Sequence, residues 1–282
     1  PARHPLPASS HPATKPSFNK YLSNIGIIAF IFTSLYGNFM QNYRDILYKD
    51  YFSTQLGRGM QSQVKEKFNS EKEQFIFEII PLLPADKEIK ILDIGCGTGS
   101  LIAALKLKGY SNCIGIDLSQ EQINVAHENG IREAQLGDLL PFLDNNQKSF
   151  DLILGMDIIE HFTKDELCTI LEKVKNALNA NGKVLFRTPN TDAPLGSIYC
   201  KGDFTHETLL NYNSAEQLFM ALGYKNISIL ASKNKVTPFT KEIIRRLLDW
   251  FFTMKIKLLL FSTGRSLKKV LLTPNLIIKA SI

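Results

Sequence analysis

Apolar strand-like segments alternate with helical segments along most of this chain, and this alternation restricts the fold more than any other feature. Continuous apolar runs predict strands at residues 89–95, 112–119, 131–139, 150–156 and 183–190. Amphipathic segments before and between them predict helices over 72–80, 100–110, 120–130 and 164–182. Short strand–helix–strand units with right-handed crossovers build a parallel sheet covered by helices. The sequence therefore predicts a doubly wound α/β fold.

The C-terminal part continues this pattern and adds an unusual segment. A helix is predicted over 214–224, and two final strands over 226–232 and 275–281. Between these strands, residues 233–274 hold ten Lys/Arg and two acids, so their net charge of +8 exceeds the +6 of the whole chain. We interpret this segment as a basic, amphipathic helical insertion before the last strand.

The first 43 residues differ from the rest in composition. Residues 1–20 contain five prolines and no acid, which is typical of disordered segments. Residues 21–43 are uncharged but include polar side chains, so we consider two interpretations: a membrane anchor, or a displaced start with Met40 opening the true domain. We expect a disordered or apolar extension over 1–43 and the main domain over 44–282.

The four cysteines are scattered and show no CxxC spacing, which argues against a disulfide-stapled domain or a zinc site. This usage indicates a reduced, cytoplasmic protein. The positive charge belongs to one segment only, so the basic isoelectric point does not by itself indicate nucleic-acid binding.

The segment LDIGCGTGS joins the first strand to the next helix and carries Gly95, Gly97 and Gly99. Glycine permits positive φ and lets a ligand approach the bare backbone, and the following helix offers unpaired N–H groups. This G-x-G-x-G pattern differs from the G-x-G-x-x-G of dinucleotide-binding proteins. The turn indicates a nucleotide-like ligand without identifying it.

Acidic side chains at the ends of three successive strands narrow the class of ligand. Asp93 lies in the first strand, Asp117 ends the second, and Asp138 follows the third. Ligands of open α/β sheets bind at this edge, where Asp117 can accept both ribose hydroxyls and Asp138 lies within reach of an adenine amino group. Each acid alone is equally consistent with a helix cap, but the three together favour an adenosine-type ligand.

The glycine turn, these acids and the strand FDLILGMDIIEHF (150–162) together resemble class I S-adenosylmethionine-dependent methyltransferases, from about residue 72 to 232 and in the last strand. The resemblance implies a seven-stranded, mostly parallel sheet with an antiparallel final strand, and S-adenosylmethionine as cofactor. It places the ribose on Asp117, the adenine near Asp138 and the methionine end on Asp93. The implied cofactor-binding residues are Asp93, Gly95, Cys96, Gly97, Gly99, Asp117, Leu118, Asp138 and Leu139.

The fourth strand ends in Asp157, Glu160 and His161, and the later segment GDFTHE adds His206. If Asp157 begins a helical turn, the first three side chains share one face. Carboxylates with imidazoles are consistent with a site for Mg, Mn or Zn formed by Asp157, Glu160, His161 and His206. The alternatives are a metal-free catalytic base, His161 or His206 assisted by Glu160, and a purely structural role.

This ligand pattern resembles the acid-x-x-Glu-His of ubiquinone-pathway O-methyltransferases and the site of small-RNA 2′-O-methyltransferases, with Asp157 as the first acid. A metal chelated by two vicinal oxygens lowers the pKa of a hydroxyl, so the set favours O-methylation. The C-terminal segment resembles bacterial surface-polysaccharide methyltransferases, which implies a sugar or lipid-linked glycan acceptor. The alternatives are a quinone-type or other small aromatic acceptor, and a non-catalytic cofactor-binding or membrane-docking module.

Residues 241–261 predict an amphipathic helix with Trp and Phe among apolar residues and Lys/Arg beside them. This composition fits a helix lying in a membrane interface, which would place the protein peripherally at the inner face of the membrane. The alternative is a helix docked on the domain or across a dimer. Nucleic acid is a weaker expectation, since the aromatic residues are not interleaved in a polar groove.

Overall fold

The computed structural model describes residues 43–48, 63–264, 266 and 268–282. The chain divides into two units, residues 1–46 and 47–282. The described part of the first unit belongs to a short helix, α2 (Tyr43–Leu47). The predicted extension and its apolar span therefore lie outside the described residues, apart from Tyr43. Among the helices that are described, none has the length and apolar character needed to cross a membrane.

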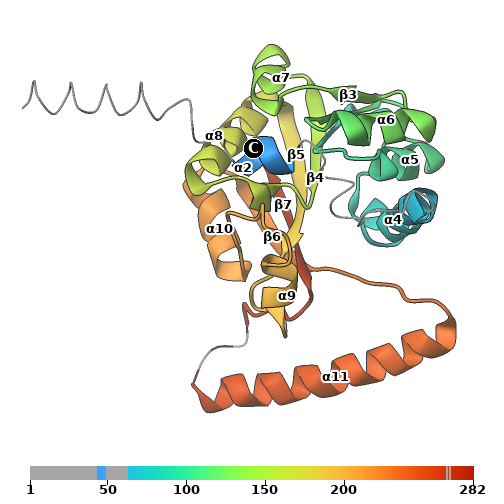
Figure 1. The fold of residues 1–282 in the computed structure, drawn as a ribbon. Helices are drawn as coiled ribbons and strands as arrows, with labels where there is room; N and C mark the ends of the chain where they lie inside the picture. Colours follow the sequence, from blue (N-terminus) through green and yellow to red (C-terminus); the bar gives the residue numbers. More distant parts are fainter. Residues whose placement is uncertain (1–42, 49–62, 265, 267) are drawn as a thin grey trace, which may run out of the picture. The chain divides into compact units, whose positions relative to one another are not determined.

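A seven-stranded sheet organises the second unit (Figure 1). Its strands are β1 (Ile91–Ile94), β2 (Cys113–Asp117), β3 (Ala134–Leu136), β4 (Phe150–Met156), β5 (Leu178–Pro189), β6 (Lys225–Ala231) and β7 (Asn275–Ser281). Their order is β3-β2-β1-β4-β5-β7-β6, with the first five strands parallel and β7 antiparallel to both of its neighbours. The predicted doubly wound sheet with an antiparallel final strand is confirmed.

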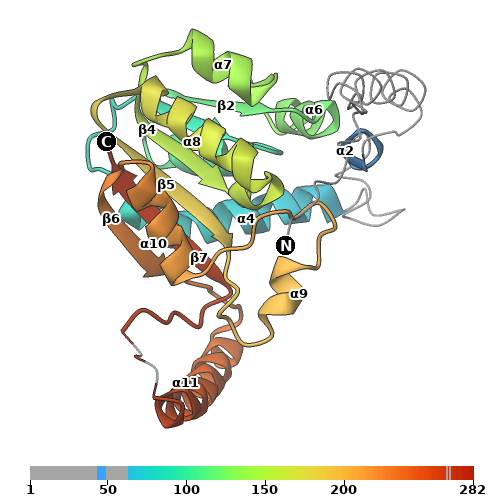
Figure 2. The same cartoon turned by 90° about the vertical axis from the view of Figure 1, so that its left-hand side faces the viewer.

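Helices cover both faces of this sheet, as Figure 2 shows. One face packs against α7 (Leu139–Asn145), α8 (Lys164–Ala177) and α10 (Tyr212–Ala221). The other face packs against α4 (Val64–Glu78), α5 (Ser100–Leu107) and α6 (Gln120–Glu128). Every residue of β1 is buried, as expected for a central parallel strand between two helical layers.

The helix starts follow local capping rules. The hydroxyl of Ser119 accepts a hydrogen bond from the Gln122 N–H, which confirms Ser119 as the predicted cap of α6. Thr163 and Glu166 form a capping box at the start of α8. The capping box fixes the backbone at the end of the loop between β4 and α8. This loop carries Asp157, Glu160 and His161.

Three features differ from the sequence prediction. The helix expected over 164–182 ends at Ala177, and β5 begins directly at Leu178. The residues before Lys183 make a tight excursion, in which a Cβ on Gly182 would lie 2.8 Å from the Asn179 carbonyl oxygen. The short helices α7, η2 (Ile80–Leu82) and α9 (Gly196–Cys200) were not predicted, because their apolar patterns are too short to show helical periodicity.

Helix α11 (Phe239–Ser262) lies between β6 and β7 in the chain, inside the basic segment 233–274. Glu242 is its single fully buried residue. The guanidinium groups of Arg245 and Arg246 both donate hydrogen bonds to the Glu242 carboxylate. The start of α11 is therefore held by ion pairs within its own first turns.

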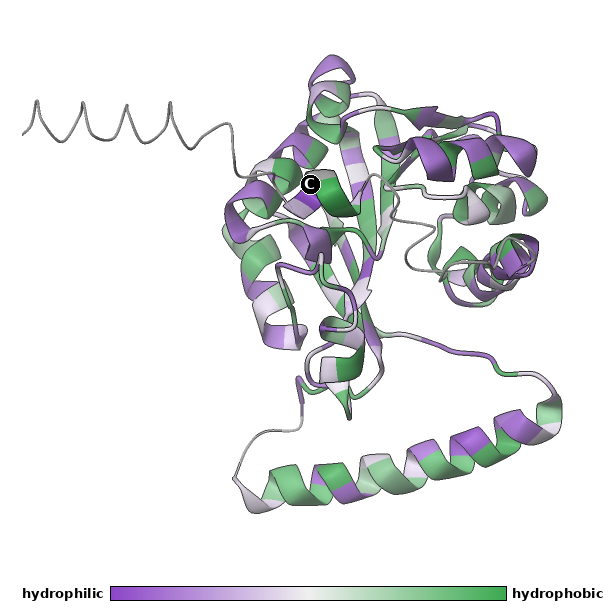
Figure 3. Cartoon of the chain, in the orientation of Figure 1, coloured by the Kyte–Doolittle hydropathy of each residue, from purple (hydrophilic) through white to green (hydrophobic). Residues whose placement is uncertain are grey.

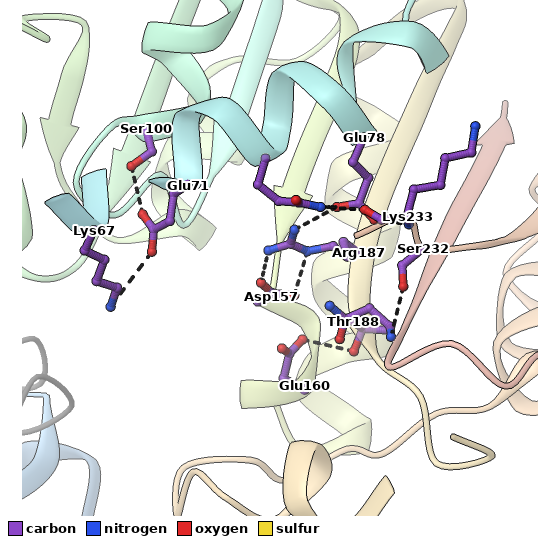
Figure 4. A network of polar contacts seen from close by, with 12 residues as sticks. Lys67, Glu71, Glu78, Ser100, Asp157, Glu160, Arg187, Thr188, Ser232 and Lys233 are labelled. Carbon is purple, nitrogen blue, oxygen red and sulfur yellow. Dashed lines mark hydrogen bonds and ion pairs between the residues drawn. The ribbon is translucent and has the colours of Figure 1, made fainter. Parts of the chain in front are cut away.

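Arg187 joins several parts of the second unit through one guanidinium group (Figure 4). Its Nη1 donates to Glu78 Oε2 of α4 at 3.0 Å, and its Nε donates to Asp157 Oδ1 at 3.0 Å. The Glu78 carboxylate is almost fully buried and also accepts the backbone N–H of Lys233 at 2.9 Å. Buried charges are tolerated only when paired, so this network fixes α4, β4 and β5 against one another.

We predict that Arg187→Met lowers the free energy of unfolding by about 3 kcal/mol, because it leaves the buried Glu78 carboxylate without its ion-pair partner. Chemical denaturation followed by circular dichroism measures this change. Lys183→Met at an exposed position of the same strand is the control, with an expected effect within about 0.5 kcal/mol. Equal stability of the two variants would contradict this role of the ion pair.

Candidate active site

The glycine turn lies between β1 and α5 and has an unusual backbone. Gly95, Gly97 and Gly99 adopt φ values of 66°, 53° and 78°, a region that favours glycine. A Cβ on Gly95 would lie 2.8 Å from the Ile158 side chain, and one on Gly99 would lie 2.9 Å from Ile131. The turn therefore needs glycine for both conformation and space, as the sequence predicted.

Asp117 at the end of β2 is directed at this turn. Its Oδ2 accepts the Gly97 N–H at 2.8 Å, and its Oδ1 accepts the Ser119 N–H at 2.8 Å. Burial raises the pKa of Asp117, while these backbone hydrogen bonds act in the opposite direction. A carboxylate offers about four acceptor sites, so hydroxyl groups of a ligand can still bind to it.

Asp93, which precedes the turn, and Cys96, which lies within it, are shielded from solvent. Asp93 is almost fully buried in β1, and both its burial and the neighbouring Asp117 raise its pKa well above the usual range. Cys96 is also buried, and burial raises the pKa of its thiol. Positive charge beside Asp93 and Asp117 would offset the cost of their carboxylates, which suits a cationic ligand.

The predicted adenine-side residues lie at the open rim. Leu118 is 64% exposed, an unusual position for a large apolar side chain beside buried neighbours. Leu139 is half-buried at the start of α7. Asp138 is the cap of α7, where its Oδ1 accepts the Leu140 N–H at 3.0 Å. The helix-cap interpretation of Asp138 therefore holds in the structure, and adenine contact stays a prediction.

The prediction that Asp157 begins a helical turn is wrong. Asp157 has a left-handed backbone with φ 54°, and the turn that follows is the 3₁₀ helix η3 (Ile159–His161). Both oxygens of its carboxylate bind the guanidinium of Arg187. The Asp157 carboxylate is thus paired with Arg187 and does not belong to the group formed by the other three residues of the predicted metal-ligand set.

The remaining three residues come together. Among the described residues, Glu160, His161 and His206 form a group whose possible ligand atoms all lie within 4.8 Å of one another. The two imidazole rings meet edge to face with centroids 4.8 Å apart. Glu160 is buried, its Oε2 accepts from the Thr188 hydroxyl at 3.0 Å, and no described group donates a hydrogen bond to its Oε1.

Hydrogen bonds orient both histidines and define the tautomer of His206. Thr205 donates its hydroxyl proton to Asp203 at 2.6 Å, so its oxygen accepts from His161 Nδ1 at 2.8 Å. The Cys200 carbonyl can only accept, so Nδ1 of His206 donates to it at 3.0 Å. A neutral His206 imidazole then carries its lone pair on Nε2, whereas the His161 ring also makes a hydrogen bond to the backbone of Asp157.

Burial shifts the acidity of this group. It raises the pKa of Glu160 well above the usual carboxylate range, and Asp157 adds to this effect. Burial and the neighbouring His206 lower the pKa of His161 to about 4. His161 is therefore neutral at physiological pH, and Glu160 is an energetically costly buried anion unless a cation or proton compensates it.

Sequence reasoning missed the residues that support this group. Arg187, Thr188, Thr205 and Cys200 each bind one of the candidate side chains, and Asp203 in turn accepts from Thr205. Thr205 and Asp203 lie beside His206 in the segment GDFTHE, and this proximity was the available signal. The contacts of Arg187 and Thr188 depend on the pairing of β4 with β5 and have no local signature.

The two halves of the site share one residue. Ile158, next to Asp157, occupies the space in which Gly95 would carry a side chain. The turn that bears Glu160 and His161 therefore packs directly on the glycine turn. A ligand bound over the glycines would lie beside the carboxylate–histidine group.

A family model described as a methyltransferase domain matches residues 63–250. An uncharacterized protein of Methanocaldococcus jannaschii is 30% identical over 144 residues, covering 48% of this chain and 64% of that protein. The ubiquinone biosynthesis O-methyltransferase of Pelagibacter ubique is 34% identical over 107 residues, covering 37% of this chain and 43% of that enzyme. The matched region thus spans less than two thirds of each of these relatives.

The fold has a solved counterpart. The crystal structure of an S-adenosylmethionine-dependent methyltransferase from Archaeoglobus fulgidus matches with a TM-score of 0.58 at 20% identity, covering 77% of this chain and 97% of that one. At this identity the likeness supports the fold alone. Because the family model covers most of the sheet and both halves of the site, the chain belongs to the methyltransferase domain family.

Proposed function

We propose that this protein is an S-adenosylmethionine-dependent O-methyltransferase. One observation carries the proposal: a glycine turn backed by Asp117 packs, through Ile158, against a carboxylate with two histidines. The first half suits a sulfonium nucleoside and the second suits a hydroxyl acceptor. Membership of the methyltransferase domain family supports the first assignment, and the O-methyltransferase relatives support the second.

The donor half fits S-adenosylmethionine, which supplies an electrophilic methyl group on a sulfonium. The left-handed glycines leave space for ligand atoms against the backbone. The remaining acceptor sites of Asp117 bind the ribose hydroxyls, and the exposed Leu118 offers an apolar surface to the adenine. Asp93 lies buried immediately before the turn, and we assign it to the methionine end of the cofactor.

The acceptor half fits a divalent metal ion. Glu160 presents a buried oxygen to which no described group donates a hydrogen bond, and a neutral His206 carries its lone pair on Nε2. When bound there, such an ion would act as a Lewis acid toward an acceptor hydroxyl. Thr188, Thr205 and the Cys200 carbonyl hold the three ligands in orientation, as second-sphere partners of metal sites do.

The residues of the chain have two tasks in this reaction. They align the acceptor oxygen with the methyl group, since positioning accounts for much of the rate of a bimolecular transfer. They also receive the hydroxyl proton; in the metal-free alternative, His206 Nε2 at the half-buried edge of the group is the best placed base. His161 is more deeply buried, and with Glu160 it forms the floor of the acceptor half.

An acceptor with two vicinal oxygens suits this group best. Similarity to ubiquinone biosynthesis O-methyltransferases favours a small aromatic diol. These relatives do not support the sugar or lipid-linked glycan acceptor expected from the sequence. We therefore include sugar diols in the assay as the alternative acceptor. Transfer of a labelled methyl group from S-adenosylmethionine to catechols or to sugar diols decides between them, and donor binding without any transfer would contradict the enzymatic proposal.

We predict that Asp117→Asn weakens S-adenosylmethionine binding at least about tenfold in isothermal titration calorimetry. Both Asp117 oxygens accept backbone N–H groups, so the NH₂ group of an asparagine would face one of these donors and lose that hydrogen bond. Glu128→Gln on the exposed end of α6 is the matched control and leaves binding unchanged. Unchanged affinity in Asp117→Asn would exclude the assigned donor site.

We also predict that the affinity for S-adenosylmethionine falls as the pH is lowered, and that it does so above the ordinary aspartate pKa of 3.8. Burial raises the pKa of Asp117 above this value, more strongly than the backbone hydrogen bonds lower it. The ionised carboxylate is the form that accepts two hydroxyls, so protonation removes binding. Calorimetric titrations over a pH series measure the midpoint, and a pH-independent affinity would contradict this role.

A third prediction concerns the acceptor half. Glu160→Gln keeps the shape of the side chain but removes its charge, so it should abolish Mn²⁺ binding in calorimetry and reduce turnover at least about tenfold. It should at the same time raise the melting temperature, because the buried anion is costly. Glu207→Gln in the adjoining loop is the control. Turnover that needs no added metal and is insensitive to chelators would exclude the metal site. A histidine would then be the catalytic base.

A further inference from the structure

Helix α11 exposes an unusually large apolar surface. Figure 3 shows green, apolar bands along its length, whereas the apolar residues of the strands lie inside the domain. The side chains involved are all exposed: Phe239, Ile243, Ile244, Leu247, Leu248, Trp250, Phe251, Phe252, Met254, Leu258, Leu259 and Phe261. Exposed apolar patches of this extent on a folded domain mark a surface that binds a partner.

Eight of these twelve apolar residues are grouped on one side of the helix. At 100° per residue, a sector of roughly 140° holds the eight residues Ile243, Ile244, Leu247, Trp250, Phe251, Met254, Leu258 and Phe261. Lys255 and Lys257 border this sector on its two sides, and the Lys255 ammonium lies 4.4 Å from the Phe251 ring centroid. The helix therefore presents an apolar face bordered by lysines.

The opposite side of α11 is less exposed. Glu242 is buried there, and Arg245, Thr253, Ile256 and Leu260 are half-buried. Glu242 accepts from Arg245 and Arg246, so one of the two acids of the basic segment 233–274 is already neutralised internally. The remaining lysines carry positive charge that no acid of this segment balances, apart from Asp249.

The apolar face of α11 and its bordering lysines fit the surface of a lipid bilayer. Aromatic residues amid aliphatic ones, bordered by lysines whose stems extend along the apolar face, match the boundary between lipid headgroups and acyl chains. The excess of positive charge is complementary to anionic lipids. With 24 residues, α11 is about 36 Å long, and its charged residues prevent it from spanning the bilayer.

We propose that α11 docks this protein on the surface of an anionic lipid bilayer. The helix lies in the plane of the interface, with Leu247 and Leu258 at the centre of the inserted face and Lys255 and Lys257 at the headgroups. The proposal does not depend on the acceptor or on methyl transfer, because α11 carries none of the residues assigned to the active site.

The sequence provides a direct probe, because Trp250 is the single tryptophan of the chain and is 65% exposed in the inserted face. We expect the fluorescence of the full chain to shift to shorter wavelength when phosphatidylcholine vesicles containing phosphatidylserine are added. Brominated acyl chains should quench it, since the indole would lie near the acyl boundary. Binding should weaken with rising salt, because the lysine contribution is screened.

Two sets of variants separate the apolar and the charged contributions. Leu247→Glu with Leu258→Glu should reduce vesicle co-sedimentation at least about tenfold, whereas the equally exposed Leu107→Glu with Met220→Glu outside α11 should leave it unchanged. Lys255→Gln with Lys257→Gln should weaken binding to anionic vesicles only. Lys108→Gln with Lys148→Gln, two exposed lysines elsewhere, is the matched control.

Two results would overturn the proposal. The first is an unchanged Trp250 spectrum and no co-sedimentation with anionic vesicles. The second is self-association, measured by sedimentation equilibrium without lipid and abolished by the double variant Leu247→Glu with Leu258→Glu. That result would show that the apolar face binds a second copy of this chain. Methyl transfer to a soluble acceptor, measured in the same variants, should stay at the level of the unaltered protein, so failure of docking and failure of the enzymatic proposal are distinguishable.

Discussion

The ion pairs of Arg187 are the interaction on which the arrangement of the site depends. One guanidinium binds a buried carboxylate on α4 and an aspartate at the end of β4, while its own strand positions Thr188 against Glu160. The same buried carboxylate accepts the N–H of Lys233, at the start of the segment that leads to α11. A single buried charge thus holds helices and loops that are more than a hundred residues apart in the chain.

The two halves of the site are built by different physical means. The donor half is a backbone feature, in which left-handed glycines and a hydrogen-bonded aspartate create space and acceptor sites. The acceptor half is a side-chain feature, in which a buried carboxylate and two imidazoles are oriented by hydroxyl and carbonyl groups. The first can be recognised from its local glycine pattern, although Asp117 and Ile158 come from other strands and loops, whereas the second requires β4, β5 and the loop of His206 to be assembled.

This difference explains how much the sequence could predict. The sheet, the glycine turn and the cap Ser119 were predictable because apolar runs, glycines and caps act over a few residues. Asp157 was misassigned because its partner Arg187 lies on a neighbouring strand, and charge pairing across strands leaves no periodic signal. The end of α8 was missed because the excursion at Asn179–Gly182 depends on the pairing of β5 with β4. The missing information was tertiary in each of these errors.

Ile158 has a consequence for how methyltransferases of this design can change. Its side chain fills the space next to Gly95, where any other residue would carry a Cβ. It therefore packs against the glycine turn, and its own backbone leads into the turn that carries Glu160 and His161. A shorter or longer side chain at this position would move both surfaces together. Under the proposed function, a substitution of Ile158 would therefore change donor affinity and acceptor selectivity together, which would constrain the evolution of a new acceptor.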